Sequence, residues 1–285
     1  MIAVTGATGH LGRLVIEALL DTQPAPSIVA AVRNPASAAD LAARGIVVRH
    51  ADYDRPETLE AALAGVDKLL LISSSEIGQR ARQHGAVVDA AKKAGVKLIA
   101  YTSILKADAS PVSLAAEHRA TEAAIRASGL PFVFLRNGWY TENYAGAVPM
   151  AVQHGAVMGS AKDGRVSAAT RRDFADAAAA VLTSSAGEAG KIYELAGDTS
   201  FTLTELAAEI ANQSGKPVAY ADLPQAAYEE ALVKVGLPAP VAAMLADSDV
   251  GVAAGWLHDD GKALSGLIGR PTTSIGETVT AALKG

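Results

Sequence analysis

The sequence predicts an α/β protein with a Rossmann-type, doubly wound parallel sheet and a smaller, mostly helical C-terminal lobe. Short apolar or β-branched runs alternate with longer segments of helical periodicity in the first half of the chain, which is the pattern of βαβ units. A glycine-rich turn separates the first apolar run from an amphipathic helix. Helical patterns dominate from Phe201 onward.

The expected strands are short and almost continuously apolar, which suits a sheet covered by helices on both faces. They span residues 2–5, 27–32, 46–49, 68–72, 97–102 and 132–135. The clearest helix covers residues 11–20, because its apolar side chains recur at helical spacing. We expect a first domain of residues 1–136, with further sheet and helix elements returning within 137–200. The second region is 137–285.

A helix is also expected in the segment TLTELAAEIANQSG of the second region. Either Thr202 or Thr204 is expected as its N-cap, and Gly215 marks its C-terminal end. The segment HDDGK at 258–262 does not continue into a calcium-binding loop, so we interpret it as a turn.

Composition excludes several classes of protein. The 285 residues are 50% hydrophobic and 19% charged, so the chain can bury a core that offsets its ordering entropy. The formal charge is −5 without a basic stripe, which argues against nucleic-acid binding. Cysteine is absent, which excludes disulfides, thiolate nucleophiles and cysteine-bound metals. The 6 histidines include no close helical pair, so no metal site is expected.

The hydropathy pattern predicts no membrane span. The longest strictly apolar stretches, such as residues 69–72, are far shorter than the roughly 20 residues that cross a bilayer. The N-terminal residues enter the first apolar run directly and lack the basic start and apolar core of a signal peptide. We therefore expect a cytoplasmic protein. The oligomeric state stays open, and a homodimer is among the assemblies that the sequence permits.

The glycine-rich turn has the spacing G-x-x-G-x-x-G, with Gly6, Gly9 and Gly12 between a strand and a helix. These glycines permit a tight turn, close approach of the backbone to a pyrophosphate, and close packing of helix on strand. An ordinary glycine-containing turn is the alternative, and the position directly after the first strand favours the nucleotide site. The residues expected to line a dinucleotide here are Gly6, Ala7, Thr8, Gly9, His10, Leu11 and Gly12.

The end of the second strand favours NADP over NAD. An acidic residue normally binds the adenosine ribose of NAD at this point, whereas this strand ends in AAVRNP. Arg33 follows Gly12 by 21 positions, and its guanidinium can make a bidentate contact with a 2′-phosphate. A surface arginine is the alternative. Asp52 and Tyr53 follow the third strand and are expected beside the adenine, unless ADYD is simply a turn.

These features are followed by LLLISSSE, AYTSILKADASP and LRNGWYTENY, and later by GKIYELAGD and MLADSDVG. Over essentially the whole chain, the sequence resembles the NmrA-like branch of the atypical short-chain dehydrogenases, and within it the bacterial NAD(P)H:quinone oxidoreductases of type 2. The resemblance implies that residues 1–136 bind NADP and that 137–285 mainly shape the substrate pocket. It also implies cofactor contacts from Ser73, Ser74, Ser75, Asn137, Gly138, Trp139, Tyr140, Thr141 and Glu142.

Each of these family positions has a structural alternative. The three serines are also what a polar strand end would show, and Trp139 and Tyr140 are also suited to aromatic packing. The activity that the resemblance implies is NADPH-dependent two-electron reduction of quinones to hydroquinones, by direct hydride transfer from the nicotinamide. The expected acceptor is a small-molecule quinone or a related carbonyl compound.

The chain lacks the Tyr-x-x-x-Lys pair with which many dehydrogenases of this superfamily protonate a carbonyl oxygen. The best register places Leu114 in the position of the tyrosine and His118 in that of the lysine. His118 has a second interpretation, as a helix-surface residue. Ser103 falls near the usual serine of the fifth strand, where without the tyrosine it is only a hydrogen-bonding group.

The missing pair fits quinone reduction, because a quinone accepts hydride readily and its reduction restores aromaticity. Hydrogen bonds to the developing hydroquinone oxygen are expected from Tyr140, Asn137 or Asn143, with the final proton from water. Two other functions stay open. One is an NADP-binding redox sensor or regulatory protein without turnover, and the other is a ketone, aldehyde or imine reductase with a substitute proton donor.

Overall fold

The computed structural model describes residues 1–284, and the chain divides into two compact units. Unit 1 consists of Met1–Ile104, Glu117–Asn137 and Arg171–Tyr193. Unit 2 consists of Leu105–Ala116, Gly138–Thr170 and residues 194–284. Each unit therefore draws on segments that are distant in the sequence.

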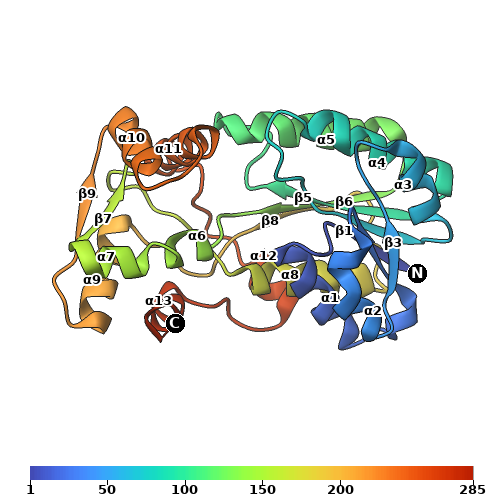
Figure 1. Cartoon of the computed structure of the whole chain (residues 1–285), viewed down its shortest axis with the longest axis horizontal. Coiled ribbons are helices and arrows are strands. Elements are labelled where there is room, and N and C mark those ends of the chain that lie inside the picture. Colours follow the sequence, from blue (N-terminus) through green and yellow to red (C-terminus); the bar gives the residue numbers. More distant parts are fainter. Residues whose placement is uncertain (285) are drawn as a thin grey trace. The chain divides into compact units, whose positions relative to one another are not determined.

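Unit 1 is built around a seven-stranded sheet in the order β3-β2-β1-β4-β5-β6-β8 (Figure 1). The strands are β1 (Ile2–Thr5), β2 (Ile28–Val32), β3 (Val47–His50), β4 (Lys68–Leu71), β5 (Leu98–Ile104), β6 (Phe132–Asn137) and β8 (Ile192–Leu195). Strands β1 to β6 pair in parallel. The strand order reverses between β1 and β4, which is the doubly wound arrangement that places ligands outside the carboxyl ends of the strands.

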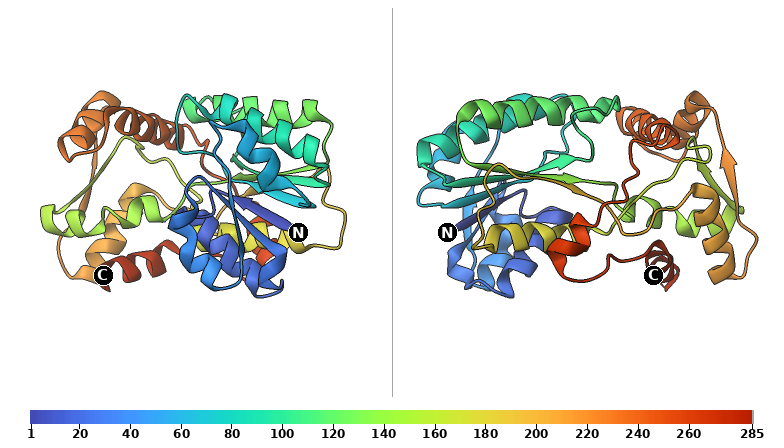
Figure 2. Two further views of the ribbon diagram at one scale, coloured as in Figure 1. Left: turned by 45° about the vertical axis from the view of Figure 1, so that its right-hand side comes forward. Right: turned by 180° about the vertical axis from the view of Figure 1, so that it is seen from behind.

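Helices cover both faces of this sheet, as Figures 1 and 2 show. One face carries α1 (His10–Leu20), α2 (Ala39–Ala43) and α8 (Arg171–Thr183), and the other carries α3 (Pro56–Leu63), α4 (Arg80–Ala94) and α5 (Ser113–Ser128). Two short 3-10 turns, η1 (Ala25–Ser27) and η2 (Pro35–Ala38), flank β2. Helix α1 contacts α8, and its apolar stripe of Leu11, Val15, Ile16 and Leu19 is buried.

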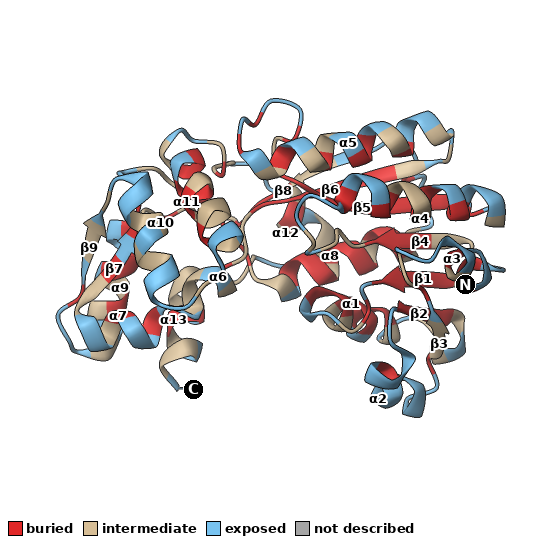
Figure 3. Ribbon diagram, turned by 45° about the horizontal axis from the view of Figure 1, so that its top comes forward, coloured by how far each residue is buried: buried red, intermediate tan, exposed pale blue. Residues whose placement is uncertain are grey.

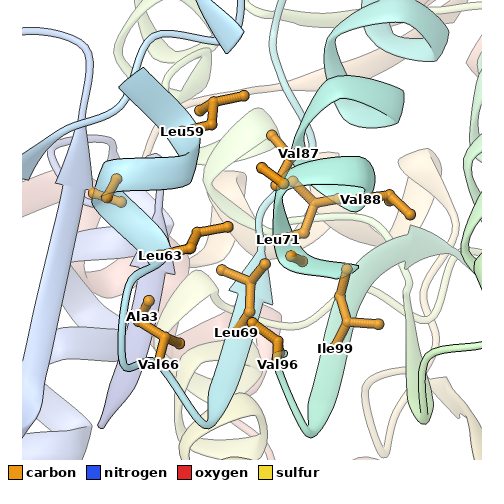
Figure 4. Close-up of a cluster of buried hydrophobic side chains, with 14 of the residues drawn as sticks. Ala3, Leu59, Leu63, Val66, Leu69, Leu71, Val87, Val88, Val96 and Ile99 are labelled. Atoms are coloured by element: carbon orange, nitrogen blue, oxygen red, sulfur yellow. The ribbon is translucent and has the colours of Figure 1, made fainter. Parts of the chain in front are cut away.

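Strands β1, β2 and β5 are buried along their whole length, and β4 and β6 are buried after their first residue, because helices cover both faces of the sheet (Figure 3). The edge strands β3 and β8 are only partly buried. A core cluster lies between the sheet and the α3–α4 layer (Figure 4). Leu69 and Leu71 of β4 are fully buried there, against Leu63 of α3 and Val87 of α4. Full burial of each such side chain contributes about 1.5–3 kcal/mol to folding.

Unit 2 is mostly helical and contains a small parallel sheet of two strands, β7 (Ala156–Gly159) and β9 (Ala219–Asp222). Its own hydrophobic cluster includes Phe201, Leu206 and Val252. The helices are α6 (Glu142–Ala145), α7 (Val148–His154), α9 (Leu203–Ser214), α10 (Gln225–Lys234), α11 (Ala239–Ala253), α12 (Ala263–Ile268) and α13 (Ile275–Lys284).

The predicted fold class is confirmed, and the six expected strands agree with β1 to β6 within two residues at each end. Thr202 is the N-cap of α9 and forms a reciprocal capping box with Glu205, while Gly215 ends the helix at a φ of 68°. β7 and β8 lie within 137–200, where further sheet elements were expected without stated bounds, whereas β9 was not expected. β9 in particular interrupts the region that was expected to be helical, because its pairing with β7 is a tertiary contact between distant segments.

Candidate active site

The turn after β1 is a glycine cradle. Gly6 adopts a φ of 58°, in the left-handed region that glycine tolerates best. A Cβ atom at Gly12 would lie 2.3 Å from the Gly6 carbonyl oxygen and 2.8 Å from the Ala7 Cα atom. Only glycine fits at position 12, because both neighbours are backbone atoms. The start of α1 is thereby held close against the turn, as the spacing of the motif predicts.

The N-terminus of α1 is open to an anion. Gly9 is its N-cap and supplies no side-chain cap, and no acidic residue lies in the first turn. Gly9 and His10 are exposed. The positive end of the helix dipole is therefore exposed at these two residues. This arrangement fits the pyrophosphate of a dinucleotide.

The loop after β4 carries the three serines and is held by its backbone. Three of its N–H groups donate to side chains: Ile72 to Thr5 Oγ1 at 3.0 Å, Ser73 to Thr102 Oγ1 at 2.9 Å, and Ser74 to His84 Nε2 at 2.9 Å. Ser73 and Ser74 are half-buried and Ser75 is exposed. The loop therefore lies at the carboxyl edge of the sheet with a fixed course.

His84 is a neutral imidazole of defined tautomer. The Ser74 N–H can only donate, so Nε2 of His84 accepts and the ring proton lies on Nδ1, which contacts Thr121 Oγ1 at 2.8 Å. The Thr121 hydroxyl donates onward to the Glu117 carbonyl oxygen. Burial lowers the pKa of His84 to about 4, and the charge of Arg80 adds to this effect. The neutral form that the loop requires is therefore present at neutral pH.

The residues expected at the adenosine end lie after β2 and β3. Arg33 is exposed, and its guanidinium pairs with Glu76 Oε1 at 2.9 Å. Asp52 is half-buried, and its Oδ1 accepts from the Asp54 N–H at 3.0 Å, which is an Asx turn. The Tyr53 ring meets His84 edge-on, with centroids 6.4 Å apart. Burial raises the pKa of Tyr53 to about 12.

Asn137 is the last residue of β6 and pairs in register with Ile104. It is 5% exposed, and its Oδ1 has no hydrogen-bond partner among residues 1–284. A buried carbonyl oxygen without a partner costs free energy, which a ligand N–H donor would recover. Together with the glycine cradle, this acceptor fits a dinucleotide that carries an amide.

The segment after Asn137 belongs to unit 2 and is tied there through its backbone. The Gly138 N–H donates to Leu195 O at 2.7 Å, and the Thr141 N–H donates to Ala169 O at 3.0 Å. Ala169 donates in turn to Trp139 O, which makes Tyr140 part of an isolated parallel bridge. Trp139 packs against the hydrophobic cluster of unit 2.

Around the bridge, Tyr140 is half-buried, whereas Asn143 is exposed on α6. Thr141 is fully buried, and Glu142 is half-buried. The bridge fixes the backbone at Tyr140, and the Asn143 N–H donates to the Tyr140 carbonyl oxygen at 3.0 Å.

His118 is a core residue, so its interpretation as a helix-surface residue is wrong. It is 4% exposed, and its Nδ1 contacts the buried Tyr101 hydroxyl at 2.8 Å. Burial lowers the pKa of His118 to about 3. Ser103 donates to Glu122 Oε1 at 2.6 Å, and Glu122 forms a buried ion pair with Arg136 at 2.7 Å. These groups stabilise the interior and form no counterpart of the missing tyrosine–lysine pair.

The side chains that hold the serine loop were not predicted from the sequence. Thr102 lies in a strand and His84 in a helix. No local sequence motif at either residue predicts its hydrogen bond to the serine loop. Glu76 was part of the string LLLISSSE, but its pairing with Arg33 joins residues 43 positions apart. One feature of the sequence could have indicated them: Thr102 and His84 are polar residues at positions that a buried strand or helix normally fills with apolar ones.

Residues 1–284 contain no group of three or more histidine, aspartate or glutamate side chains placed to hold a metal ion. Within the same residues, no helix combines the length and apolar character that crossing a membrane requires.

Comparison with known proteins gives consistent results. A profile described as NmrA-like family matches residues 1–252. Quinone oxidoreductase 2 of Escherichia coli (strain K12) is 59% identical over 280 residues, which is 98% of each chain. The crystal structure of an NADPH-dependent quinone oxidoreductase from Escherichia coli, complexed with NADPH, superposes with a TM-score of 0.97 at 57% identity, covering 99% of this chain and 100% of that one.

A second solved structure is also similar. The triphenylmethane reductase of Citrobacter sp., complexed with NADP(H), has a TM-score of 0.95 at 42% identity, with 99% of this chain and 100% of that chain covered. The resemblance inferred from the sequence motifs is thereby confirmed, and the chain belongs to the NmrA-like family.

Proposed function

We propose that this protein is an NADPH-dependent quinone oxidoreductase, which reduces quinones to hydroquinones by two-electron transfer. The observation that carries the proposal is the glycine cradle with its open helix N-terminus, in a chain similar over its whole length to an NADPH-bound quinone oxidoreductase. Bound NADPH supplies the hydride. The protein binds and orients the two reactants.

The cofactor contacts follow the carboxyl edge of the unit 1 sheet. The backbone of Gly6–Gly12 binds the pyrophosphate, and Arg33 binds the 2′-phosphate of the adenosine ribose. Asp52 and Tyr53 border the adenine. The serines at 73–75 hydrogen-bond the nicotinamide ribose, and Asn137 accepts the carboxamide N–H through its unpartnered Oδ1. Residues 138–142 complete the nicotinamide contacts.

Tyr140, Asn137 and Asn143 orient the acceptor by hydrogen bonds to a quinone oxygen. As hydride reaches the quinone, negative charge develops on this oxygen, and donors placed there stabilise it. Water delivers the one proton that completes the hydroquinone. No strongly acidic side chain is required, because the quinone is already a good hydride acceptor and the product is aromatic. This accounts for the absence of a Tyr-x-x-x-Lys pair.

We further predict that residues 1–136 form the NADP-binding core, that 137–285 mainly form the substrate-pocket lobe, and that the reaction takes place in the cytoplasm. The oligomeric state stays open, and size-exclusion chromatography with light scattering tests whether the protein is a homodimer.

The test of the activity is NADPH oxidation at 340 nm by the purified protein, with and without a simple benzoquinone, after subtraction of the uncatalysed rate. We expect saturable turnover that is proportional to enzyme and requires the quinone. NADPH binding without turnover, across several quinones and carbonyl compounds, would contradict the enzyme assignment and support an NADP-binding sensor. Faster turnover of ketones, aldehydes or imines than of quinones would contradict the acceptor class.

A further inference from the structure

We propose that Glu76 is a specificity-determining residue, which limits the preference for NADPH over NADH by competing with the 2′-phosphate for Arg33. The inference rests on the proposed role of Arg33 as the residue that binds this phosphate. It assigns to the serine loop a second function besides contact with the ribose, because Glu76 directly follows Ser75.

The carboxylate of Glu76 is placed by buried groups as well as by Arg33. Its Oε1 accepts from Arg33 at 2.9 Å, while its Oε2 accepts from Gln83 Nε2 at 2.7 Å. Gln83 is 2% exposed, so its amide is fixed by the surrounding packing and holds Glu76 Oε2 in place. The backbone N–H of Glu76 also donates to Ser74 Oγ at 3.1 Å. The carboxylate is therefore anchored at the guanidinium that the phosphate needs.

The charges around Arg33 already balance without a ligand. Arg82 pairs with Asp54 at 2.6 Å, and Asp54 Oδ1 also lies 3.4 Å from Gln83 Nε2. The cluster thus contains two guanidinium groups and two carboxylates. A 2′-phosphate adds negative charge beside Arg33 while Glu76 is held there, and like charges so close repel one another.

NADH does not meet this repulsion, because its ribose carries an uncharged 2′-hydroxyl in place of the phosphate. A carboxylate at the adenosine end is moreover the group that accepts a hydrogen bond from this hydroxyl in NAD-binding sites. Glu76 therefore weakens the binding of NADPH and leaves the binding of NADH unaffected or improved. The pair of Arg33 and Glu76 produces a smaller cofactor preference than Arg33 alone would give.

The test compares the dissociation constants of NADPH and NADH, measured by titration of cofactor fluorescence, for the intact protein and four variants. Glu76→Gln removes the charge but keeps a side chain that Gln83 can hydrogen-bond. We expect it to bind NADPH about tenfold more tightly, as the loss of one nearby surface like charge predicts. The dissociation constant of NADH should stay within about twofold.

Glu60→Gln is the matched control. It also removes one carboxylate charge, from an exposed ion pair that Glu60 forms with Lys93 in the last turn of α4. It should leave both dissociation constants unchanged. Arg33→Ala and the double variant Arg33→Ala/Glu76→Gln complete a double-mutant cycle. In the Arg33→Ala background, Glu76→Gln should change the dissociation constant of NADPH by less than about twofold, because the guanidinium for which Glu76 and the phosphate compete is absent.

Two results would overturn the role of Glu76. One is NADPH binding that Glu76→Gln leaves unchanged, and the other is an equal gain for both cofactors. The Arg33 assignment is judged separately: it stands if Arg33→Ala weakens NADPH alone, and it fails if both cofactors weaken equally. Circular dichroism and melting temperature, expected to match those of the intact protein, confirm that each variant is folded.

Discussion

The two units hold the residues that we propose for the cofactor and the acceptor by different means. In unit 1, the glycine turn and the serine loop are held by backbone geometry and by side chains buried within the same unit. In unit 2, backbone hydrogen bonds to Ala169 and Leu195 hold the segment after Asn137, while the side chains of Tyr140 and Asn143 are left at or near the surface. A backbone cradle suits a constant cofactor, and polar side chains at or near the surface suit an acceptor that varies.

Two similar solved structures combine the same kind of cofactor with different acceptors. One is a quinone oxidoreductase complexed with NADPH, and the other is a triphenylmethane reductase complexed with NADP(H). Their names indicate chemically unrelated acceptors. From the difference between the units we expect small changes of backbone packing to weaken the affinity for the cofactor. Acceptor choice should instead respond to changes of single polar groups.

The strongest test of the comparison is Gly12→Ala. The added Cβ atom would lie 2.3 Å from a carbonyl oxygen of the turn, so α1 must move away from Gly6. We expect NADPH affinity to fall by about a hundredfold or more, the range that 1 Å misplacements produce in positioned sites. Isothermal titration with NADPH measures this loss.

Gly85→Ala is the matched control. Gly85 lies in α4, and nothing lies within 4 Å of a Cβ atom added there. The exchange should stabilise the fold by about 0.5–1 kcal/mol through helix propensity, with NADPH affinity unchanged. Wild-type affinity in Gly12→Ala would contradict the cradle.

The next effect concerns pH, to which the two units respond in opposite directions. The pKa of His84 is lowered to about 4 and that of His118 to about 3, whereas the unfolded value is 6.5. Below pH 6.5, unfolded unit 1 therefore binds protons at these histidines that folded unit 1 does not bind. Lowering the pH from 7 to 5 should therefore reduce the stability of unit 1. The expected loss is about 1–2 kcal/mol for each histidine.

Burial of Asp249 in unit 2 raises the pKa of its carboxyl to about 6, above its unfolded value of 3.8. Folded unit 2 then gains a proton that the unfolded form lacks, and the same pH change should stabilise it by about 1 kcal/mol. Hydrogen exchange of core amides, corrected for intrinsic rates, separates the two responses. Asp249→Asn should abolish the gain in unit 2 and leave unit 1 unaffected. Equal loss of protection in both units would show that they unfold together and would remove this contrast.

The smallest expected effect is that of Tyr140→Phe on quinone reduction. The lost hydroxyl is one of several donors, so kcat/KM for a benzoquinone should fall only about threefold, as for a neutral hydrogen bond. Carbonyl compounds need a proton donor, so any side activity with a ketone should be almost lost. Tyr193→Phe is a suitable control, because that hydroxyl donates to Glu188 at 2.7 Å. A quinone rate reduced as strongly as the ketone rate would identify Tyr140 as an obligatory acid.

The sequence predicted those parts of the site that depend on local geometry. The turn at Gly6, the strand ends and the position of Arg33 follow from residues close together in the chain. The partners of these residues do not, since Glu76 reaches Arg33 and His84 reaches Ser74 only after α4 has packed on the sheet. For the same reason β9 was not predicted, and β7 had no predicted bounds within the region 137–200 where sheet elements were expected. Each has four residues, and neither forms a strand without the other.

The central claim is that unit 1 recognises NADPH through Arg33 and delivers its hydride to a quinone. Its most direct test is kcat/KM for NADPH and for NADH with one benzoquinone, in the intact protein and in Arg33→Ala. The account predicts a loss of about tenfold to a hundredfold for NADPH, the range for a charged hydrogen bond, with a change below about twofold for NADH. An equal loss for both cofactors would contradict it.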